Sequence, residues 1–500
     1  GKCTRNFYED PVHIREMKKV AADNGYDALI AKLSAPAVTK EGKAAVVGGG
    51  PAGMAAAYFL RRAGMAVTLF EKKSALGGVV RHVIPEFRIP GTSIDKDTAL
   101  LEKIGVEIRT NTEITSVEAL KGEGYTNVVL AVGAYKPGNV RLEAGEAVNA
   151  LRFLEEFKAK DGNLDLGKVV AVIGGGNTAM DTARAAKRTK GVEKVSLVYR
   201  RTKRYMPADE EELVMAVEDG VEFMELLAPV KAENGKLICK VMELGEPDAS
   251  GRRGVNETEE IREIPADTVI AAVGEKVPEE FYRANGLNVN ERGRAFVNED
   301  TCESSVAGVY VVGDGLGGPA TVVEGIRDGL KAAEAIIGEK LVRDYDAKTE
   351  EAVIYERKGN LSDIKTDADE SKRCLNCAAI CENCVEVCPN RANISIRVPG
   401  LAKHQVIHVD YMCNECGNCK SFCPYSSAPY LDKFTLFADE ADMENSKNQG
   451  FTVLDKENVT CKVRLLGEVT TWTKGEETRI PESLQKLMET VCAEYAYLLR

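Results

Sequence analysis

The sequence predicts an α/β protein that carries two strand–loop–helix units and, later in the chain, a small α+β domain rich in cysteine. Two glycine-rich loops, each lying between an apolar strand and a helical stretch, predict the first part. Nine of the 14 cysteines lie between Cys374 and Cys423, and they predict the second part. A chain of 500 residues exceeds the size of one hydrophobic core, so we expect about three domains.

The first loop reads Gly48-x-Gly50-x-x-Gly53 and follows the apolar stretch KAAVV. A helical stretch comes next, and a second strand ends at Glu71. Such a loop lets a pyrophosphate approach the helix N-terminus, and an acid about 20 residues further on binds the adenosine ribose. Because strand, loop, helix and acid occur together, we expect a dinucleotide here.

The second loop, Gly174-x-Gly176-x-x-Ala179, is built in the same way, but its second strand ends in Arg200 and Arg201. A guanidinium can bind the 2′-phosphate of NADP(H), which a carboxylate would repel. The second loop therefore predicts a site for NADP(H), with NAD(H) as the weaker alternative.

A later segment completes the first site. The strand at 309–312 leads into Gly313 and Asp314, and a helix begins near Thr321. Asp314 can accept a hydrogen bond from a ribityl hydroxyl, and the helix N-terminus can face the electron-rich N1–C2=O2 edge of a flavin. The first loop and this segment together predict FAD.

Residues 40–340 resemble the flavin-dependent pyridine-nucleotide oxidoreductases of the glutamate synthase small-subunit type, which also form the front end of dihydropyrimidine dehydrogenase. The stretches that carry the resemblance are VVGGGPAGMAAA, the Gly77-Gly78 pair followed by IPEFRIP, LAVGA, VIGGGNTAMD, YRRTKRYMPA and VYVVGDG. The resemblance implies two nested Rossmann-like nucleotide-binding domains, with the NADPH domain inserted into the FAD domain. It also implies that residues 86–90 lie near the flavin.

The motifs and the resemblance together give two sets of site residues. Those expected at FAD are Gly48, Gly50, Pro51, Ala52, Gly53, Glu71, Gly77, Gly78, Arg88, Gly133, Gly313, Asp314, Thr321 and Val322. Those expected at NADP(H) are Gly174, Gly176, Asn177, Thr178, Ala179, Arg200 and Arg201.

The cysteines form two runs with the spacing of bacterial ferredoxins, which hold two [4Fe–4S] clusters. In that pattern the cysteine before proline ligates the cluster of the other run. One cluster would therefore take Cys388, Cys413, Cys416 and Cys419. The other would take Cys377, Cys381, Cys384 and Cys423, with Cys374 as an alternative ligand. Zinc binding by the same thiols is disfavoured by the two Cys-Pro pairs and the reciprocal spacing.

In the two enzymes named above the cysteine-rich region precedes the flavin domain, whereas here it follows it. This order is most similar to the iron–sulfur flavoproteins named as selenate reductase subunits. That resemblance implies an association with selenium- or molybdenum-dependent purine hydroxylases.

Composition excludes several other functions. The net charge of −12 disfavours a nucleic-acid partner, and no run of 18 apolar residues predicts a membrane span. The N-terminus lacks a secretory signal, and clustered cysteines in a large acidic chain indicate metal ligands in the reducing cytoplasm. The chain begins with Gly1 rather than methionine, which fits a processed product or a part of a longer polypeptide.

The expected domains follow from these motifs. They are an N-terminal helical or linker segment at 1–40, an FAD domain at 41–150 and 286–340, an NADPH domain at 151–285, a linker at 341–372, a ferredoxin-like domain at 373–430, and C-terminal strands and a helix at 431–500.

The predicted function is an oxidoreductase subunit that passes electrons between NADP(H), FAD, two [4Fe–4S] clusters and a partner redox subunit. No side chain need act as acid or base, because the cofactors carry the chemistry. One alternative is an iron–sulfur scaffold with an inactive flavin site, which the two intact loops disfavour. Another is a disulfide reductase of the thioredoxin reductase type, but only Cys239 lies between 150 and 300, and that enzyme needs a CxxC there.

Overall fold

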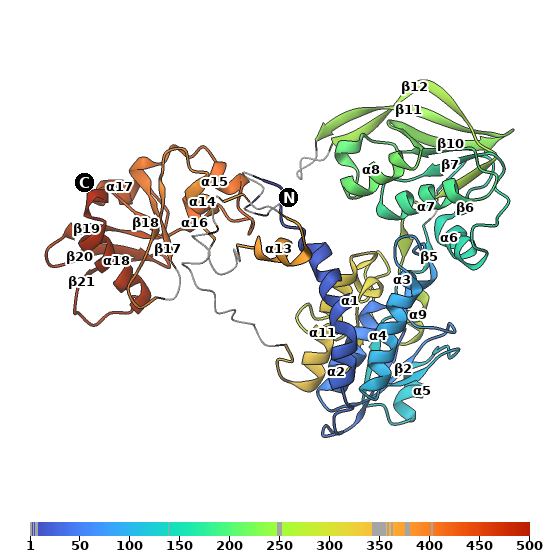
Figure 1. Ribbon diagram of the computed structural model, residues 1–500, viewed down its shortest axis with the longest axis horizontal. Helices are drawn as coiled ribbons and strands as arrows, with labels where there is room; N and C mark the ends of the chain where they lie inside the picture. The colour runs from blue at the N-terminus through green and yellow to red at the C-terminus, as the bar shows by residue number, and fades with distance from the viewer. Residues whose placement is uncertain are drawn as a thin grey trace. The chain divides into compact units, whose positions relative to one another are not determined.

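The computed structural model describes the chain except for residues 1–2, 4, 6–8, 139, 248–252, 343–356, 358–359, 362–363, 376–380 and 402–403. The chain forms two compact units (Figure 1). The nucleotide unit comprises residues 28–343, and the cysteine unit comprises residues 344–500 together with residues 1–27. No helix in the described ranges combines the length and the apolar character needed to cross a bilayer.

The nucleotide unit contains two parallel five-stranded sheets. The first has the order β15 (Val309–Val311), β4 (Asn127–Leu130), β1 (Lys43–Val47), β2 (Ala66–Phe70) and β3 (Glu107–Arg109). From the central β1, the chain places β2 and β3 on one side and β4 and β15 on the other. The order therefore reverses at β1, and ligands of open α/β sheets bind beyond the carboxyl ends of the strands at such a point.

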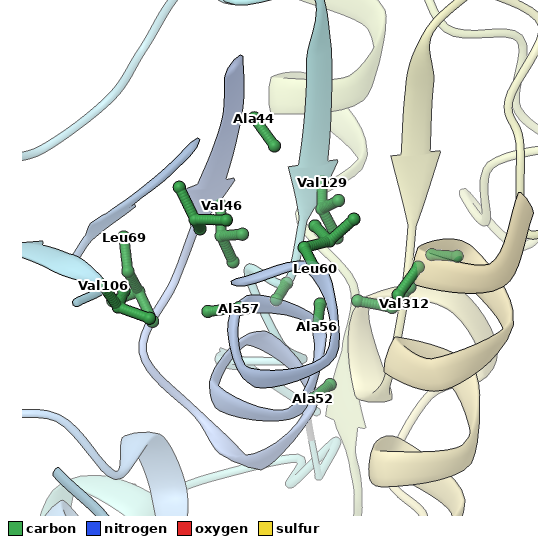
Figure 2. Packing of buried hydrophobic residues seen from close by; sticks show 14 of the residues in the cluster. Ala44, Val46, Ala52, Ala56, Ala57, Leu60, Leu69, Val106, Val129 and Val312 are labelled. Atoms are coloured by element: carbon green, nitrogen blue, oxygen red, sulfur yellow. The ribbon is translucent and has the colours of Figure 1, made fainter. Parts of the chain in front are cut away.

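Small residues allow close packing of the helices on this sheet. Alanines of α2 (Pro51–Arg62) lie against Val46 and Val129 of the sheet (Figure 2). On its other side α2 contacts α11 (Val322–Ile337), where a Cβ on Gly329 would lie 2.5 Å from the Ala52 carbonyl oxygen. The remaining helices of this part are α3 (Gly78–His82), α4 (Gly91–Lys103), α5 (Val117–Gly122), α9 (Glu279–Ala284) and α10 (Asp314–Gly317).

The second parallel sheet has the order β6 (Val148–Asn149), β13 (Thr268–Ala271), β7 (Val169–Ile173), β8 (Lys194–Val198) and β9 (Val221–Met224). Helices α6 (Ala150–Ala159), α7 (Asn177–Arg188) and α8 (Glu210–Glu218) accompany it. The predicted α/β fold with two Rossmann-like sheets is therefore confirmed. The short strands β5 (Lys136–Pro137) and β14 (Glu275–Lys276) pair antiparallel between the two parts of this unit.

Between β9 and β13 the chain forms an antiparallel sheet of β10 (Leu227–Glu233), β11 (Lys236–Pro247) and β12 (Arg253–Pro265). Just before it, the acidic stretch at 208–220 has helical spacing, which predicts a solvated face and a buried stripe at Leu213 and Val217. Leu213 is half-buried and packs against the core, but Val217 is 51% exposed, so the prediction is wrong at Val217. The buried side chains of α8 are Glu212 and Ala216, because Glu212 pairs with Arg88 of the segment that precedes α4.

The cysteine unit contains one mixed six-stranded sheet. Its order is β16 (Asn393–Ile396), β17 (Gln405–Val409), β18 (Thr435–Leu436), β19 (Gly450–Asp455), β20 (Thr460–Leu465) and β21 (Glu468–Thr473). Short helices α14 (Asn383–Glu386) and α15 (Asn418–Ser421) carry cysteines, and α16 (Pro429–Asp432), α17 (Glu440–Asn445) and α18 (Glu482–Glu494) follow. Because β17 pairs with β18, the sheet crosses the boundary at residue 430 that the sequence suggested.

The N-terminal residues also belong to the cysteine unit. Residues 1–27 include the first part of α1 (Ile14–Lys32), and they supply Arg5, which is 2% exposed and donates from Nε to the main-chain oxygen of Arg373. Arg373 follows α13 (Asp367–Lys372) and pairs with Glu370 at 2.8 Å. This buried pair lies directly before Cys374, so the N-terminus helps to fix the chain where the cysteine region begins.

Candidate functional sites

A cavity of about 470 Å³ lies at the carboxyl edge of the first sheet, where the strand order reverses. Most residues expected at FAD line it: Gly48, Gly50, Pro51, Ala52, Glu71, Gly78, Gly133, Gly313, Asp314, Thr321 and Val322. The structure therefore brings together residues that the sequence spreads over more than half of the chain.

The glycine loop at this cavity has no room for side chains. Gly48 has φ +106°, and a Cβ there would lie 2.3 Å from the Ala131 carbonyl oxygen. Glu71 holds the loop from the next strand, because its Oε2 accepts from the Gly49 N–H at 2.8 Å. A carboxylate has further lone pairs, so Glu71 can also accept from a ribose hydroxyl. The exposed backbone and the positive end of α2 fit a pyrophosphate.

Another part of the cavity wall carries Asp314 and the start of α11, which the sequence predicts at the flavin end of FAD. Asp314 is held by the Ala320 N–H at 3.1 Å, and burial raises the pKa of its carboxyl to about 6. Thr321 caps α11 in a capping box with Glu324. The positive end of this 16-residue helix therefore points at the cavity, as needed to stabilise negative charge on a reduced flavin.

Three residues expected at FAD do not line the cavity. Gly53 lies inside α2, where a Cβ would meet the Gly48 carbonyl oxygen at 1.9 Å, so it serves helix–strand packing. Gly77 donates its N–H to the Gly49 carbonyl oxygen at 2.7 Å and supports the loop from outside. Arg88 lies on the segment that the resemblance placed near the flavin, but its guanidinium contacts the second nucleotide-binding part instead.

Arg88 bridges two buried carboxylates on the helices of the second sheet. Its Nη1 donates to Asp181 of α7 at 2.6 Å and its Nη2 to Glu212 of α8 at 2.5 Å. Burial raises the pKa of both carboxyls. Phe87 adds a cation–π contact, with the Arg188 guanidinium 4.3 Å from its ring centre. The segment around Arg88 thus joins the FAD-binding part to the NADPH-binding part.

Replacing Arg88 with methionine should destabilise the nucleotide unit by about 2–3 kcal/mol, because two buried carboxylates lose their main partner. Arg184, which also faces Glu212, limits the loss. Because burial already raises both carboxyl pKa values, the loss should be largest at neutral pH and smaller where the carboxyls are protonated. The stability loss is measured by heating each protein and following the rise in fluorescence as FAD is released from the unfolding nucleotide unit.

Arg283→Met is the matched control, since Arg283 is exposed and pairs only within α9. An unchanged unfolding temperature for Arg88→Met, with Arg283→Met also unchanged, would show that the bridge does not stabilise the unit.

The second glycine loop has the same construction. Gly174 has φ +150°, and a Cβ there would lie 2.4 Å from the Ala272 carbonyl oxygen. Ala179 is fully buried under the loop. The Tyr199 ring packs against the loop at Gly175, where an added Cβ would lie 2.4 Å from the ring. No atom lies within 4 Å of a Cβ position on Gly176, so the start of α7 is open to a pyrophosphate.

Polar residues in the first turn of α7 are held by neighbouring loops. Asn177 accepts from the Asp209 N–H at 3.0 Å, and Thr178 donates to Glu275 at 3.3 Å. Burial raises the pKa of Glu275, which also experiences the charge of Asp314. Glu275 therefore lies between the two nucleotide-binding parts.

Arg200 and Arg201 follow β8 at the carboxyl edge of the second sheet. Arg200 is exposed, and Arg201 is half-buried with its Nε donating to the Arg253 carbonyl oxygen at 3.3 Å. Both residues follow the second strand of the glycine-loop unit, which is the position from which a Rossmann-like site binds a 2′-phosphate, so the prediction for Arg200 and Arg201 stays open.

In the cysteine unit, four thiols expected at one cluster line a single cavity. This four-cysteine cavity is lined by Cys388 of the first run and by Cys413, Cys416 and Cys419 of the second. Main-chain N–H groups already point at two of the sulfurs: Ala392 at Cys388 and Glu415 at Cys413, each at 3.2 Å. N–H groups directed at sulfur are typical of iron–sulfur sites.

The four-cysteine cavity has the right donors for a [4Fe–4S] cluster, because its thiols come from both cysteine runs. Within the described ranges, no three or more His, Cys, Asp or Glu side chains could together hold one metal ion. A four-iron cluster binds each thiolate at a different iron, so its ligands need not meet at one point.

The thiols expected at the other cluster are less completely described. Cys377 lies outside the described residues, and Cys374 is exposed. Cys384 and Cys423 are buried, and Cys381 is half-buried. Burial raises the pKa of the Cys384 thiol to about 11, with the neighbouring thiols of Cys381 and Cys419 adding to the effect. Metal ions would be needed to hold such thiols as thiolates.

Ser395, His404 and Glu382 form a cluster that resembles a hydrolase triad only in composition. His404 Nδ1 lies 3.2 Å from Ser395 Oγ and 3.3 Å from Glu382 Oε1. A triad needs the serine and the acid on opposite ring nitrogens, whereas here both contact the same one. This geometry does not support hydrolysis.

His408 provides a pH test of the cysteine unit. It is 1% exposed, and burial lowers its pKa to about 4. The unfolded chain takes up the proton near pH 6.5, so stability should fall by about 3 kcal/mol as the pH drops from 6.5 to 4. The single tryptophan, Trp472, is buried in the core of this unit and reports its unfolding by fluorescence.

In His408→Gln this pH dependence should become shallower by that amount. Identical slopes for the wild type and His408→Gln would contradict a neutral, buried His408.

Comparison with known families agrees with the geometry of the nucleotide unit. Residues 42–329, more than half of the chain, match the family model described as pyridine nucleotide-disulphide oxidoreductase. The chain belongs to this family. The family and its relatives identify it as an NAD(P)H-dependent flavin oxidoreductase, and the predicted family resemblance is confirmed.

Individual relatives extend this result. YgfK of Escherichia coli K12, named as an oxidoreductase, is 40% identical over 99% of this chain and 50% of its own length, so the chain spans about half of that relative. A protein named as a glutamate synthase (NADPH) small chain of Cereibacter sphaeroides is 34% identical over 65% of this chain and 84% of its own length. Mycobacterium tuberculosis FprA, solved with NADPH, shares the fold at 20% identity, with a TM-score of 0.50 over 60% of this chain and 84% of FprA.

The family name refers to disulfide reduction, but residues 42–329 contain no pair of neighbouring cysteines that could form a redox-active disulfide. The two cysteines of this region, Cys239 and Cys302, are far apart in sequence, and burial raises their pKa values to about 12 and about 11. Such thiols are unreactive at neutral pH. A thioredoxin-reductase-type enzyme needs a CxxC pair, and Cys239 and Cys302 do not form one.

Sequence reasoning missed part of the cavity wall. Residues 112–114 line it because they follow β3 at the same carboxyl edge, a position that the strand order could have indicated. Phe281 and Tyr135 also line it, and they carry no motif.

Proposed function

We propose that this chain is the electron-transfer part of a larger redox enzyme. When bound, FAD would exchange a hydride, which is two electrons and a proton, with NADP(H). The two electrons would pass singly between the flavin and a redox partner through two [4Fe–4S] clusters, in either direction, with protons exchanged with solvent. When bound, FAD supplies the conversion between paired and single electrons, and this chain positions the cofactors.

The four-cysteine cavity supports this proposal most strongly. It brings cysteines of both runs together as the ferredoxin pattern requires, in a chain whose other unit binds FAD and NADPH. The iron–sulfur scaffold with an inactive flavin site is disfavoured, because both glycine loops and the α11 N-terminus keep a form that fits their ligands.

The arrangement of domains forms part of the proposal. We assign FAD to residues 41–150 and 286–340 and NADPH to residues 151–285. We assign the clusters to a module of residues 373–500, because the sheet continues across residue 430. For the other cluster we propose Cys381, Cys384 and Cys423 as ligands together with Cys377, or with Cys374 as the alternative. Thiols held as iron ligands require a reducing compartment, which supports the cytoplasm.

We propose a further redox subunit as the partner, with a molybdenum hydroxylase acting on a purine-like substrate as the first class to test. Support comes from the resemblance to iron–sulfur flavoproteins associated with such enzymes, and from a relative named as one chain of an NADPH enzyme. Anaerobic co-purification, with identification of every subunit and metal, tests this partner.

The function itself is tested by purifying the chain without oxygen and adding NADPH or NADH. We expect about eight irons per chain, and we expect NADPH to bleach the flavin faster than NADH does. Iron with an unreactive flavin would favour the scaffold, and a reactive flavin without iron would remove the clusters from the proposal.

A further inference from the structure

Asn393 lies between the two predicted cluster sites. It belongs to β16, is 2% exposed and lines the four-cysteine cavity. Its Nδ2 donates to the main-chain oxygen of Cys384, a predicted ligand of the other cluster, at 3.1 Å. One buried side chain therefore contacts both sites.

The position of Asn393 is set by the sheet. Asn393 of β16 is directly opposite His408 of the antiparallel strand β17. Side chains of such cross-strand pairs meet on one face of a sheet. His408 Nδ1 lies 3.1 Å from Asn393 Oδ1, and both residues are buried.

The chemistry of these contacts leaves only one orientation of the amide. The Cys384 carbonyl oxygen only accepts, so the amide must turn its nitrogen toward it. The amide oxygen then faces His408, whose Nδ1 must carry the proton. A neutral, buried His408 with Nδ1–H satisfies this requirement, so the histidine locks the amide.

The locked amide nitrogen has a second N–H. Since the first N–H is used by Cys384, the second is available to a sulfur in the four-cysteine cavity. Hydrogen bonds to sulfur stabilise the more negative, reduced form of a cluster and raise its reduction potential. Outer groups of this kind tune metal sites by about 10–100-fold.

We propose that Asn393 is a positioning residue that links the two cluster sites and, through this N–H, makes the cluster in the four-cysteine cavity easier to reduce. The inference rests on the proposed function, because it requires that the clusters be present. Asn393 does not ligate iron, and it acts through Cys384 and through sulfur.

Asn393→Leu tests the proposal, because leucine keeps the volume of the side chain and removes the amide. Iron content and an EPR-monitored redox titration are compared with the wild type, with signals assigned by a Cys416→Ser variant. The matched control is Asn414→Leu, since Asn414 lines the same cavity but is exposed. We expect full iron in Asn393→Leu and at least a tenfold lower fraction of the reduced cluster at a given potential, which is 59 mV for one electron.

If Asn393→Leu fails to load iron, His408→Leu replaces it as the test variant. This variant keeps Asn393 but removes the histidine that fixes the orientation of its amide. It should also lower the reduced fraction of the cluster at a given potential. A reduced fraction within twofold of the wild type in the variant that loads would overturn the proposal, as would an equal shift in Asn414→Leu. A wild-type chain without iron would instead overturn the proposed function.

Discussion

Replacing Gly50 with alanine should weaken FAD binding without disturbing the protein. Gly50 has φ −75° and ψ 178°, which alanine adopts freely, and the nearest atom to an added Cβ is the Gly78 Cα at 3.8 Å. Only the pyrophosphate needs this space. We expect about 10–100-fold weaker FAD binding, matching an overpacking cost of 1–3 kcal/mol.

Gly176→Ala is the counterpart at the second loop. Gly176 has φ −99°, and no atom lies within 4 Å of its Cβ position. This variant should keep FAD and bind NADPH about 10–100-fold more weakly. Flavin content after dialysis and NADPH titration of flavin fluorescence measure the two effects. The assignment of the loops would be wrong if Gly50→Ala weakened only NADPH or Gly176→Ala released FAD.

Gly48 and Gly174 would be poorer choices for this test. Each has a positive φ, and an added Cβ would collide with a neighbouring carbonyl oxygen at 2.3 and 2.4 Å. Their substitution would distort the loop itself, so lost binding would not show which ligand the loop holds.

Cys416→Ser should separate the two halves of the electron path. Serine keeps the shape of the side chain but is a poor iron ligand, so iron should fall by about half, from eight to four per chain. NADPH should still bleach the flavin at the wild-type rate, because the nucleotide unit is unchanged. Reduction of a one-electron acceptor should fall by about a hundredfold or more, since a lost ligand exceeds the 10–100-fold effect of an outer group.

Cys239→Ala is the control, because it removes a buried thiol from β11 in the nucleotide unit. Trp472 fluorescence checks that the cysteine unit of Cys416→Ser stays folded. Unchanged iron content, or equal loss of flavin bleaching and acceptor reduction, would contradict the assignment of Cys416.

Local motifs were enough to predict both nucleotide sites. A glycine loop, the strand before it and the helix after it are contiguous, so the residues that need close backbone approach can be read directly from the sequence. The strand order then follows from the connections, and the structure shows Asp314 and Thr321 at the cavity with Gly48.

Long-range pairings could not be predicted in this way. Arg88 pairs with carboxylates 93 and 124 residues away, so its segment alone could not show that it contacts the second nucleotide-binding part. The stripe predicted for α8 was wrong at Val217, because Glu212 is buried by this same pairing. The Asn393–His408 pair depends on the register of β16 and β17, which no motif specifies.

The central claim is that this chain converts electron pairs into single electrons. Anaerobic titration of the reconstituted chain with NADPH, with absorbance of the flavin and of the iron–sulfur chromophore followed together, tests it most directly. Since FAD takes two electrons and each cluster takes one, we predict an end point of about two NADPH per FAD. An end point of about one, with the iron–sulfur absorbance unchanged, would show that electrons stop at the flavin and would contradict the claim.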